Sequence, residues 1–238
     1  MSITIERTRV GMLMNNVYYL SDGESGILVD PSCKPERLKT LLNGRRVDAI
    51  LLTHYHFDHI GAAAEMRRVT GAPVYASALD APYIENPTAA PGRDFKIEPC
   101  TVDVRVDEGF ILRVGASEWR AIMTPGHSPG SMCWLLEIAQ LGAAQGDDTA
   151  DATAGAVGPV VPAFPVTAAG GSDAYAGILI SGDTLFEGTF GRTDFEDGSH
   201  SDMMRSLARL SELHDDVLVL PGHGEPTTIR AERFCTLR

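Results

Sequence analysis

THYHFDHIGA, residues 53–62, is the most informative stretch of this 238-residue chain. It places three histidines and one aspartate (His54, His56, Asp58 and His59) within six consecutive positions. Imidazole and carboxylate groups bind zinc, manganese, iron and similar ions, and the absence of cysteine from the cluster argues against a closed structural zinc site. A loop with surface histidines is the alternative interpretation, but structural histidines come singly. The stretch therefore predicts an open metal site.

The neighbouring sequence predicts how these side chains are presented. Residues 47–53 (VDAILLT) are apolar and β-prone, so a buried strand is expected to end in the metal-binding loop. Side chains alternate along extended backbone, so His54 and His56 lie on the same side and can bind one ion. Asp58 and His59 follow at the start of a predicted helix, from which they can reach a second, adjacent ion.

Three further metal-capable residues each follow a predicted strand, in a turn that contains Gly or Pro. They are His127 in TPGHSPGS, Asp183 in SGDTLF and His223 in LPGHGEP. Side chains at strand ends can converge on one edge of a sheet although they are far apart in the sequence. The remaining histidines, His200 and His214, are expected near the start and the end of a helix, in structural roles.

Together with GRTDF (residues 191–195), these motifs resemble those of the metallo-β-lactamase superfamily, whose signature is HxHxDH. Within that superfamily the chain is similar to the glyoxalase II-like hydrolases, including their short bacterial forms. The resemblance covers about residues 3–233, apart from one inserted stretch. It implies an α/β fold, an αββα sandwich in which two mixed β-sheets pack face to face with helices on their outer faces.

The resemblance also implies a ligand set and a catalytic residue. Relatives that reduce oxygen or nitric oxide at a di-iron centre have Glu at the position of His56, so that branch is set aside. Asp58 is the expected catalytic residue, because it can hold the attacking water and handle its proton. Two divalent cations are implied, expected to be zinc with iron or manganese as alternatives, and their ligands would be His54, His56 and His127 for one ion, Asp58, His59 and His223 for the other, and Asp183 for both.

The implied reaction is metal-assisted hydrolysis of a thioester of the hydroxyacyl-thiol type. Bound cations lower the pKa of water toward neutrality, so a metal-bound hydroxide can attack the thioester carbonyl at pH 7. One alternative is a mononuclear iron dioxygenase acting on persulfides, which shares HxHxDH and GRTDF but usually reads PAHDY where this chain has PGHGEP. The other alternative is a non-catalytic metal-binding module.

Arg192 in GRTDF is the candidate for binding a substrate carboxylate, and its alternative role is to pair with Asp194 or Asp197 and order the loop. The longer glyoxalase II enzymes have a C-terminal helical extension with basic residues for glutathione. This chain has only three arginines after position 229, which argues against glutathione. The aromatic side chains that could line the pocket, or serve only in packing, are Tyr18, Tyr55 and Tyr83.

Composition limits the partners and the compartment. The formal charge is -12 and basic residues form no run longer than a pair, so nucleic acid is not an expected partner. No stretch approaches the ~20 apolar residues of a membrane span, and the N-terminus lacks the pattern of a secretory signal. We expect a cytoplasmic monomer or homodimer that takes a small-molecule thioester. The four cysteines lack paired spacing and are expected to be free thiols.

Residues 139–176 differ from the rest because Ala, Gly, Pro, Asp and Thr dominate them. Such a composition buries too little to offset the entropy of ordering, so we predict an inserted surface loop within one domain spanning residues 1–238, with a lid over the site as the alternative. The flanking strands are expected to pair directly. A two-stranded hairpin is predicted before Asp30, and helices are predicted over residues 34–44, 60–70 and 199–214.

Overall fold

The computed structural model describes residues 2–90, 96–137, 161–167 and 175–237. Within these ranges the strands form two large sheets and one small hairpin, which pairs β12 (Leu185–Phe186) with β13 (Thr189–Phe190). All four cysteines are free, as predicted.

The first sheet has seven strands among the described residues. Its strands from β3 to β6 run parallel, and the others pair antiparallel, so the sheet is mixed. In spatial order the strands are β10 (Val161–Thr167), β1 (Ser2–Val10), β2 (Asn15–Ser21), β3 (Gly26–Val29), β4 (Ala49–Leu51), β5 (Val74–Ser77) and β6 (Val104–Val106).

The second sheet has six strands in the described part of the chain and is also mixed, because only the β11 and β14 pair is parallel. The direct pairing of β9 with β11 confirms that the strands flanking the inserted stretch are neighbours. In spatial order the strands are β15 (Thr227–Thr228), β14 (Val217–Pro221), β11 (Gly177–Gly182), β9 (Met132–Glu137), β8 (Ser117–Met123) and β7 (Ile111–Val114).

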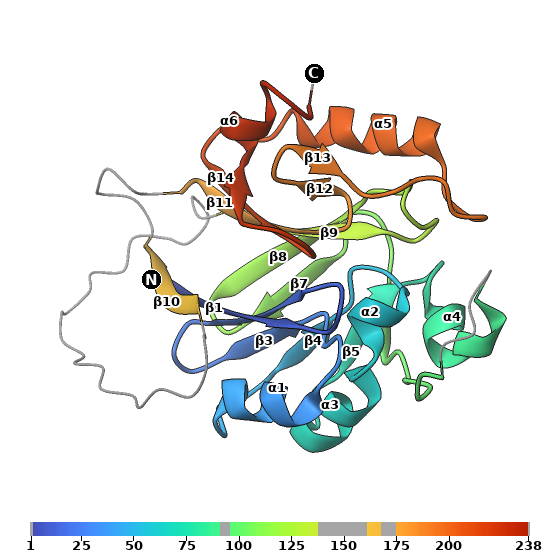
Figure 1. Ribbon diagram of the computed structural model, residues 1–238. Coiled ribbons are helices and arrows are strands. Elements are labelled where there is room, and N and C mark those ends of the chain that lie inside the picture. The colour runs from blue at the N-terminus through green and yellow to red at the C-terminus, as the bar shows by residue number, and fades with distance from the viewer. Residues whose placement is uncertain (1, 91–95, 138–160, 168–174, 238) are drawn as a thin grey trace.

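Helices cover the outer faces of both sheets, as Figure 1 shows. Helices α1 and α3 lie against the first sheet, and α5 and α6 lie against the second. The predicted αββα order of layers is therefore confirmed. The helical segments are α1 (Pro35–Leu42), α2 (Phe57–Ile60), α3 (Ala63–Thr70), α4 (Ala81–Glu85), the 3-10 turn η1 (Pro87–Ala89), α5 (His200–Leu210) and α6 (Ile229–Glu232).

The layers are held together by apolar packing on both sides of each sheet. Between the sheets, Trp119 and Trp134 are fully buried in a cluster that also takes Tyr18 from the first sheet. On the outer face of the second sheet, α5 buries Met203 and Leu207. Burial of large apolar side chains is the dominant favourable contribution to folding, and here it fixes the two sheets face to face.

Three sequence predictions about the elements were wrong in part. Three strands precede Asp30, whereas two were predicted. Strands β2 and β3 form the predicted hairpin, and the additional strand β1 pairs with β2 along its length. The helix predicted over residues 60–70 is split into α2 and α3, because Ala62 between them has non-helical dihedral angles. The backbone N–H of Ala62 donates to the carbonyl of Pro31 at 2.8 Å, and a Cβ on the neighbouring Gly61 would lie 2.4 Å from the carbonyl oxygen of Ser32.

The third correction concerns residues 139–176, predicted as a surface loop. Residues 161–167 of this stretch form strand β10, which pairs antiparallel with β1 at the edge of the first sheet. Inter-strand hydrogen bonds of the backbone do not depend on a high content of large apolar residues, so the composition of the stretch did not reveal the strand. Residues 138–160 and 168–174 lie outside the described part of the chain, and the choice between loop and lid stays a prediction there.

Candidate metal centre

The predicted site residues follow the ends of four strands that belong to both sheets. β4 leads into the HxHxDH loop, β8 precedes His127, β11 ends one residue before Asp183, and β14 ends two residues before His223. The structure brings all of these loops to one place, because the ligand-capable atoms form overlapping groups within 4.8 Å of one another. Convergence at strand ends is therefore confirmed.

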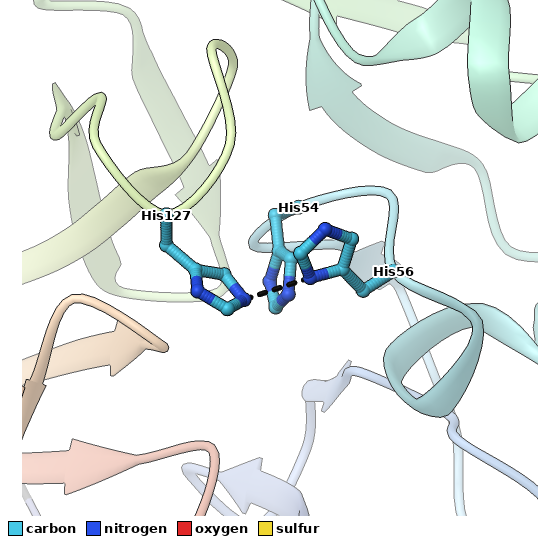
Figure 2. A group of neighbouring side chains, drawn as sticks. All are labelled: His54, His56 and His127. Atoms are coloured by element: carbon cyan, nitrogen blue, oxygen red, sulfur yellow. Dashed lines mark hydrogen bonds between the residues drawn. The ribbon is translucent and has the colours of Figure 1, made fainter. Parts of the chain in front are cut away.

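The grouping of these atoms matches the two expected triads. Figure 2 shows the side chains of His54, His56 and His127 pointing toward one another, with Nδ1 of His56 2.7 Å from Nε2 of His127. The three groups are His54, His56 and His127; Asp58, His59 and His223; and His54, His59 and Asp183.

Asp183 lies between the two triads. One carboxylate oxygen is 3.3 Å from Nε2 of His59, and the other is 3.4 Å from Nε2 of His127 and 3.5 Å from Nε2 of His223. The carboxylate therefore faces residues of both triads, which is the position expected of a bridging ligand. Within the second triad, Oδ2 of Asp58 is 3.4 Å from Nε2 of His223 and 3.7 Å from Nε2 of His59.

Four of the five histidines are oriented by a partner at Nδ1, which leaves Nε2 facing the cluster. Metal-binding histidines in proteins are usually fixed in this way, because the partner sets the tautomer and the ring orientation. The Nδ1 partners are Thr53 Oγ1 for His54 at 3.0 Å, Asp30 Oδ2 for His59 at 2.9 Å, the carbonyl of Arg192 for His127 at 2.8 Å and the carbonyl of Leu13 for His223 at 3.0 Å.

Several buried atoms of the cluster lack a hydrogen bond. Nε2 of His54, Nε2 of His59 and Oδ1 of Asp183 have no hydrogen-bond partner among the described residues. A buried polar atom without a partner destabilises a protein by about 1–3 kcal/mol, and bound cations would satisfy all three of these atoms at once. The imidazole and carboxylate donors suit zinc, iron and manganese. The residues therefore fit divalent cations.

The charges of the cluster shift several pKa values. Burial by itself would lower the pKa of His223, but hydrogen bonds to Asp183 and Asp58 outweigh it and raise that pKa to about 9. The pKa of His59 is also raised well above its usual value, because the charges of Asp183 and Asp58 outweigh its burial. Burial lowers the pKa of His54 well below the usual range. Protons on His59 and His223 thus balance the carboxylates in the metal-free protein, and cations would replace them.

Sequence reasoning missed two polar residues that support the ligands. Asp30 accepts hydrogen bonds from the backbone N–H and hydroxyl of Thr53, at 2.8 and 2.7 Å, besides its contact with His59. Asn15 donates from Nδ2 to Oδ2 of Asp58 at 3.0 Å. Asp30 stands directly after β3, and this position at a strand end could have pointed to it.

Asp80 is a third supporting residue, fully buried between β5 and α4. Its Oδ2 accepts from the backbone N–H of Tyr55 at 3.0 Å and from the hydroxyl of Ser128 at 2.9 Å. Burial raises the pKa of Asp80 to about 7, although these hydrogen bonds oppose the shift. One carboxylate thus links the loop of His54 and His56 to the loop of His127.

A pocket of about 550 Å³ opens beside the cluster, and Arg192 lines it. Its guanidinium donates from Nε and Nη2 to the carboxylate of Asp194 at 2.8 and 3.0 Å and lies 4.6 Å from the centre of the Phe195 ring. The structural role weighed for Arg192, pairing with Asp194, is therefore observed. The structure does not test the substrate role.

The other candidate residues lie apart from this pocket. No tyrosine is among the described residues that line it. Tyr18 donates to the carbonyl of Pro221 at 2.8 Å, and Tyr55 packs against Tyr83 with ring centres 4.8 Å apart. His200 begins α5 and His214 follows its end, as expected for structural roles, although the helix stops at Leu210.

In the described part of the chain, no helix has the length and apolar character needed to cross a membrane.

A family model described as "Metallo-beta-lactamase superfamily" matches residues 10–141 and 155–223. The chain therefore belongs to the metallo-β-lactamase superfamily. It is 27% identical over 233 residues to the probable metallo-hydrolase YqgX of Bacillus subtilis, with 95% of this chain and 93% of that protein covered. It is 24% identical over 221 residues to hydroxyacylglutathione hydrolase GloC of Haemophilus influenzae, with 89% and 86% covered.

Solved structures agree with this assignment. The BLEG-1 B3 metallo-beta-lactamase is 28% identical, with a TM-score of 0.71 and coverage of 97% of this chain and 96% of that one. TTHA1623 in a di-iron-bound form is 29% identical, with a TM-score of 0.69 and coverage of 97% and 98%. ETHE1 from Myxococcus xanthus, 23% identical with a TM-score of 0.67 and coverage of 96% and 81%, shares the fold. The chain is thus a member of a metallo-hydrolase superfamily with a metal-binding cluster of His and Asp.

Proposed function

We propose that this chain is a metal-dependent hydrolase that cleaves thioesters at a dinuclear centre, in the manner of hydroxyacylglutathione hydrolase. The observation that carries the proposal is the position of Asp183, within 3.5 Å of ligand atoms from both triads. Such a carboxylate suits a site for two neighbouring cations. We propose zinc as the metal, and iron is the alternative that the di-iron form of TTHA1623 suggests.

Two bound cations would lower the pKa of a water molecule toward neutrality and polarise the substrate carbonyl. Asp58 is the residue that would hold this water and take its proton. Burial opposes ionisation of Asp58, but the charge of His59 and hydrogen bonds with His223 and Asn15 lower its pKa well below the usual value. The carboxylate is therefore ionised at neutral pH. Because so acidic a carboxyl group is a weak base, transfer of the proton to it would depend on the cations lowering the pKa of the water.

The reaction balances without a further acid. The water oxygen adds to the carbonyl carbon, the carbon–sulfur bond breaks, and the thiolate leaves and takes up a proton, so the products are a carboxylic acid and a thiol. A thiolate is a good leaving group. The relative GloC, whose name states this type of reaction and which aligns over 89% of the chain, supports the choice of a thioester.

The sequence around the last histidine favours this proposal over a mononuclear persulfide dioxygenase, because this chain reads PGHGEP where those relatives usually read PAHDY. Asp58, His59 and His223 also lie together as a second group that could hold a metal ion, which supports a dinuclear site. The likeness to ETHE1, at 23% identity, concerns the fold alone.

The test measures metal content together with turnover of S-lactoylglutathione and simpler thioesters. We expect two metal ions per chain and a His54→Ala variant that keeps its far-UV circular dichroism but loses activity by at least about 1,000-fold. His214→Ala is the matched control, because this side chain is 65% exposed. Equal rates for His54→Ala and the unchanged protein would contradict the proposal.

Two other results would replace the proposal with an alternative. One iron per chain, together with oxygen uptake on a persulfide, would indicate the dioxygenase. Complete inactivity of the metal-loaded protein on the thioester panel and on persulfides would indicate a binding module.

A further inference from the structure

The pocket beside the metal cluster has an apolar wall that the proposed chemistry does not use. Leu13 contributes from the loop between β1 and β2, and Phe186 and Phe190 contribute from the β12–β13 hairpin. Phe57 and Phe195 also line the pocket. Leu13 is about half exposed, so a bound group can cover more of its apolar surface.

Aromatic rings adjoin the metal cluster on two sides. The ring of Phe186 lies 5.9 Å from that of His223, centre to centre. The ring of Phe195 lies 5.2 Å from that of His56 and 5.4 Å from that of His127. A substrate whose carbonyl reaches the cluster would therefore place its neighbouring groups against aromatic and aliphatic side chains.

Away from the metal-binding residues, the charges around the pocket do not suit the carboxylates of an anionic substrate. Apart from the metal-binding residues, its charged lining among the described residues is Arg192 and Glu196. Arg192 is already bound to Asp194 through two hydrogen bonds. Glutathione carries two carboxylates, and each would need a cation or several donors to replace its water. The overall charge of -12 also disfavours the approach of anions.

We propose that the substrate is a thioester with an apolar acyl group, aliphatic or aromatic, on a thiol that carries no carboxylates. The inference rests on the proposed function and names its substrate class. Leu13, Phe186 and Phe190 are the residues that select the acyl group, through burial of its apolar surface.

The test compares hexanoyl and acetyl thioesters of N-acetylcysteamine, a neutral thiol, and of glutathione, with the zinc-loaded protein. On the neutral thiol we expect kcat/KM to be at least about tenfold higher for hexanoyl than for acetyl, because the longer chain buries more methylene groups. For the same acyl group, we expect the neutral thioester to be hydrolysed faster than the glutathione thioester.

Variants of the apolar wall test the assignment of residues. Leu13→Ser changes a side chain that is 54% exposed, so the fold is not at risk, and Phe186→Ala is the second variant. In both we expect the hexanoyl-to-acetyl ratio to fall to within about threefold of unity. Phe234→Ala is the matched control, since Phe234 is 71% exposed and does not line the pocket. A preserved ratio in both wall variants would overturn the assignment.

Binding of non-hydrolysable thioethers separates this inference from the proposed function. By calorimetry we expect S-hexyl-N-acetylcysteamine to bind at least about tenfold tighter than the S-methyl compound, and Leu13→Ser to remove the difference. If no thioester is hydrolysed, the proposed function fails, and the binding measurement still decides the preference of the pocket. Faster hydrolysis of S-lactoylglutathione than of the hexanoyl thioester, or equal binding of both thioethers, would overturn the inference.

Discussion

Asp30 illustrates what single residues contribute to this site. Its carboxylate binds both polar groups of Thr53, at the start of the metal-binding loop, and Nδ1 of His59, at the end of that loop. Thr53 in turn contacts Nδ1 of His54. One buried carboxylate therefore orients histidines of both triads, and partners of this kind tune metal affinity.

The pKa of His223 gives a pH prediction for the metal-free protein. Its folded-state pKa of about 9 exceeds the ordinary value of 6.5, so its contribution to stability is complete below about pH 6.5 and is lost as the pH rises through 9. The raised pKa of His59 acts in the same direction. We expect the free energy of unfolding to fall by roughly 3 kcal/mol over this window, because one pKa unit corresponds to about 1.4 kcal/mol.

The measurement is chemical denaturation with a chelator present, from about pH 6 to about pH 9.5. His223→Asn should show a shallower decline, because one of the two raised pKa values is removed. Bound zinc should oppose the decline, since the cation binds the neutral imidazole and its affinity rises with pH. Constant or rising stability of the metal-free protein across this range would show that protonation of His223 and His59 does not stabilise the fold in the absence of the cations.

The seven expected ligands could be identified because four of them stand in the dense HxHxDH motif and the other three follow predicted strands in motifs that resemble one superfamily. The structure brings all seven together. Their function as ligands stays a prediction until metal is measured. Asn15 and Asp80 could not be identified in this way. Each is a single polar residue outside any motif, and Asn15 meets Asp58 only through a fold that joins positions 43 residues apart.

At the scale of elements, Asp80 couples two loops that carry ligands of the first triad. Asp80→Ala would remove the acceptor of the Tyr55 N–H and of the Ser128 hydroxyl. We expect a loss of about 2–3 kcal/mol of stability and a 10–100-fold loss of metal affinity, because buried donors lose a partner and ligands lose their orientation. Denaturation and chelator competition measure the two effects.

Asp80→Asn is the matched control for this coupling. It keeps a carbonyl oxygen as an acceptor in nearly the same volume, so we expect smaller losses than for alanine. Metal affinity of Asp80→Ala equal to that of the unchanged protein would show that the two loops hold their positions without this contact.

Helix α5 offers a matched pair of adjacent methionines. Met203 is fully buried against the second sheet, whereas Met204 is 38% exposed. We expect Met203→Ala to lower the free energy of unfolding by about 2–5 kcal/mol and Met204→Ala to change it by about 0.5 kcal/mol or less. Denaturant titration of the two variants decides this, and similar losses in both would contradict the assigned face of the helix.

The strongly periodic helix α5 was predicted correctly except for its C-terminal end, which lies at Leu210 and not at residue 214, whereas elements governed by tertiary contacts were not predicted. Helix α5 follows the apolar repeat of its sequence, and Ser199 caps it by accepting from the Asp202 N–H. The break between α2 and α3 coincides with contacts of Ala62 and Gly61 with the backbone of Pro31 and Ser32, which no local pattern shows. Local propensity is a weak guide wherever tertiary packing opposes it.

For the whole molecule, the layer order could be predicted because strands and helices alternate along the chain and the motifs resemble one superfamily. The strand β10 at the edge of the first sheet could not be predicted. β10 joins β1 from a stretch whose composition indicates a loop, and the pairing connects positions about 160 residues apart. Pairings at such separation leave no short-range signal in the sequence.

The proposed dinuclear centre depends on the whole molecule, since loops from both sheets must meet around the two cations. Anomalous diffraction at the zinc absorption edge, from crystals grown with zinc, would locate both ions. We expect two peaks, one among His54, His56 and His127 and one among Asp58, His59 and His223, with Asp183 between them. A single peak, or peaks away from these side chains, would contradict the account.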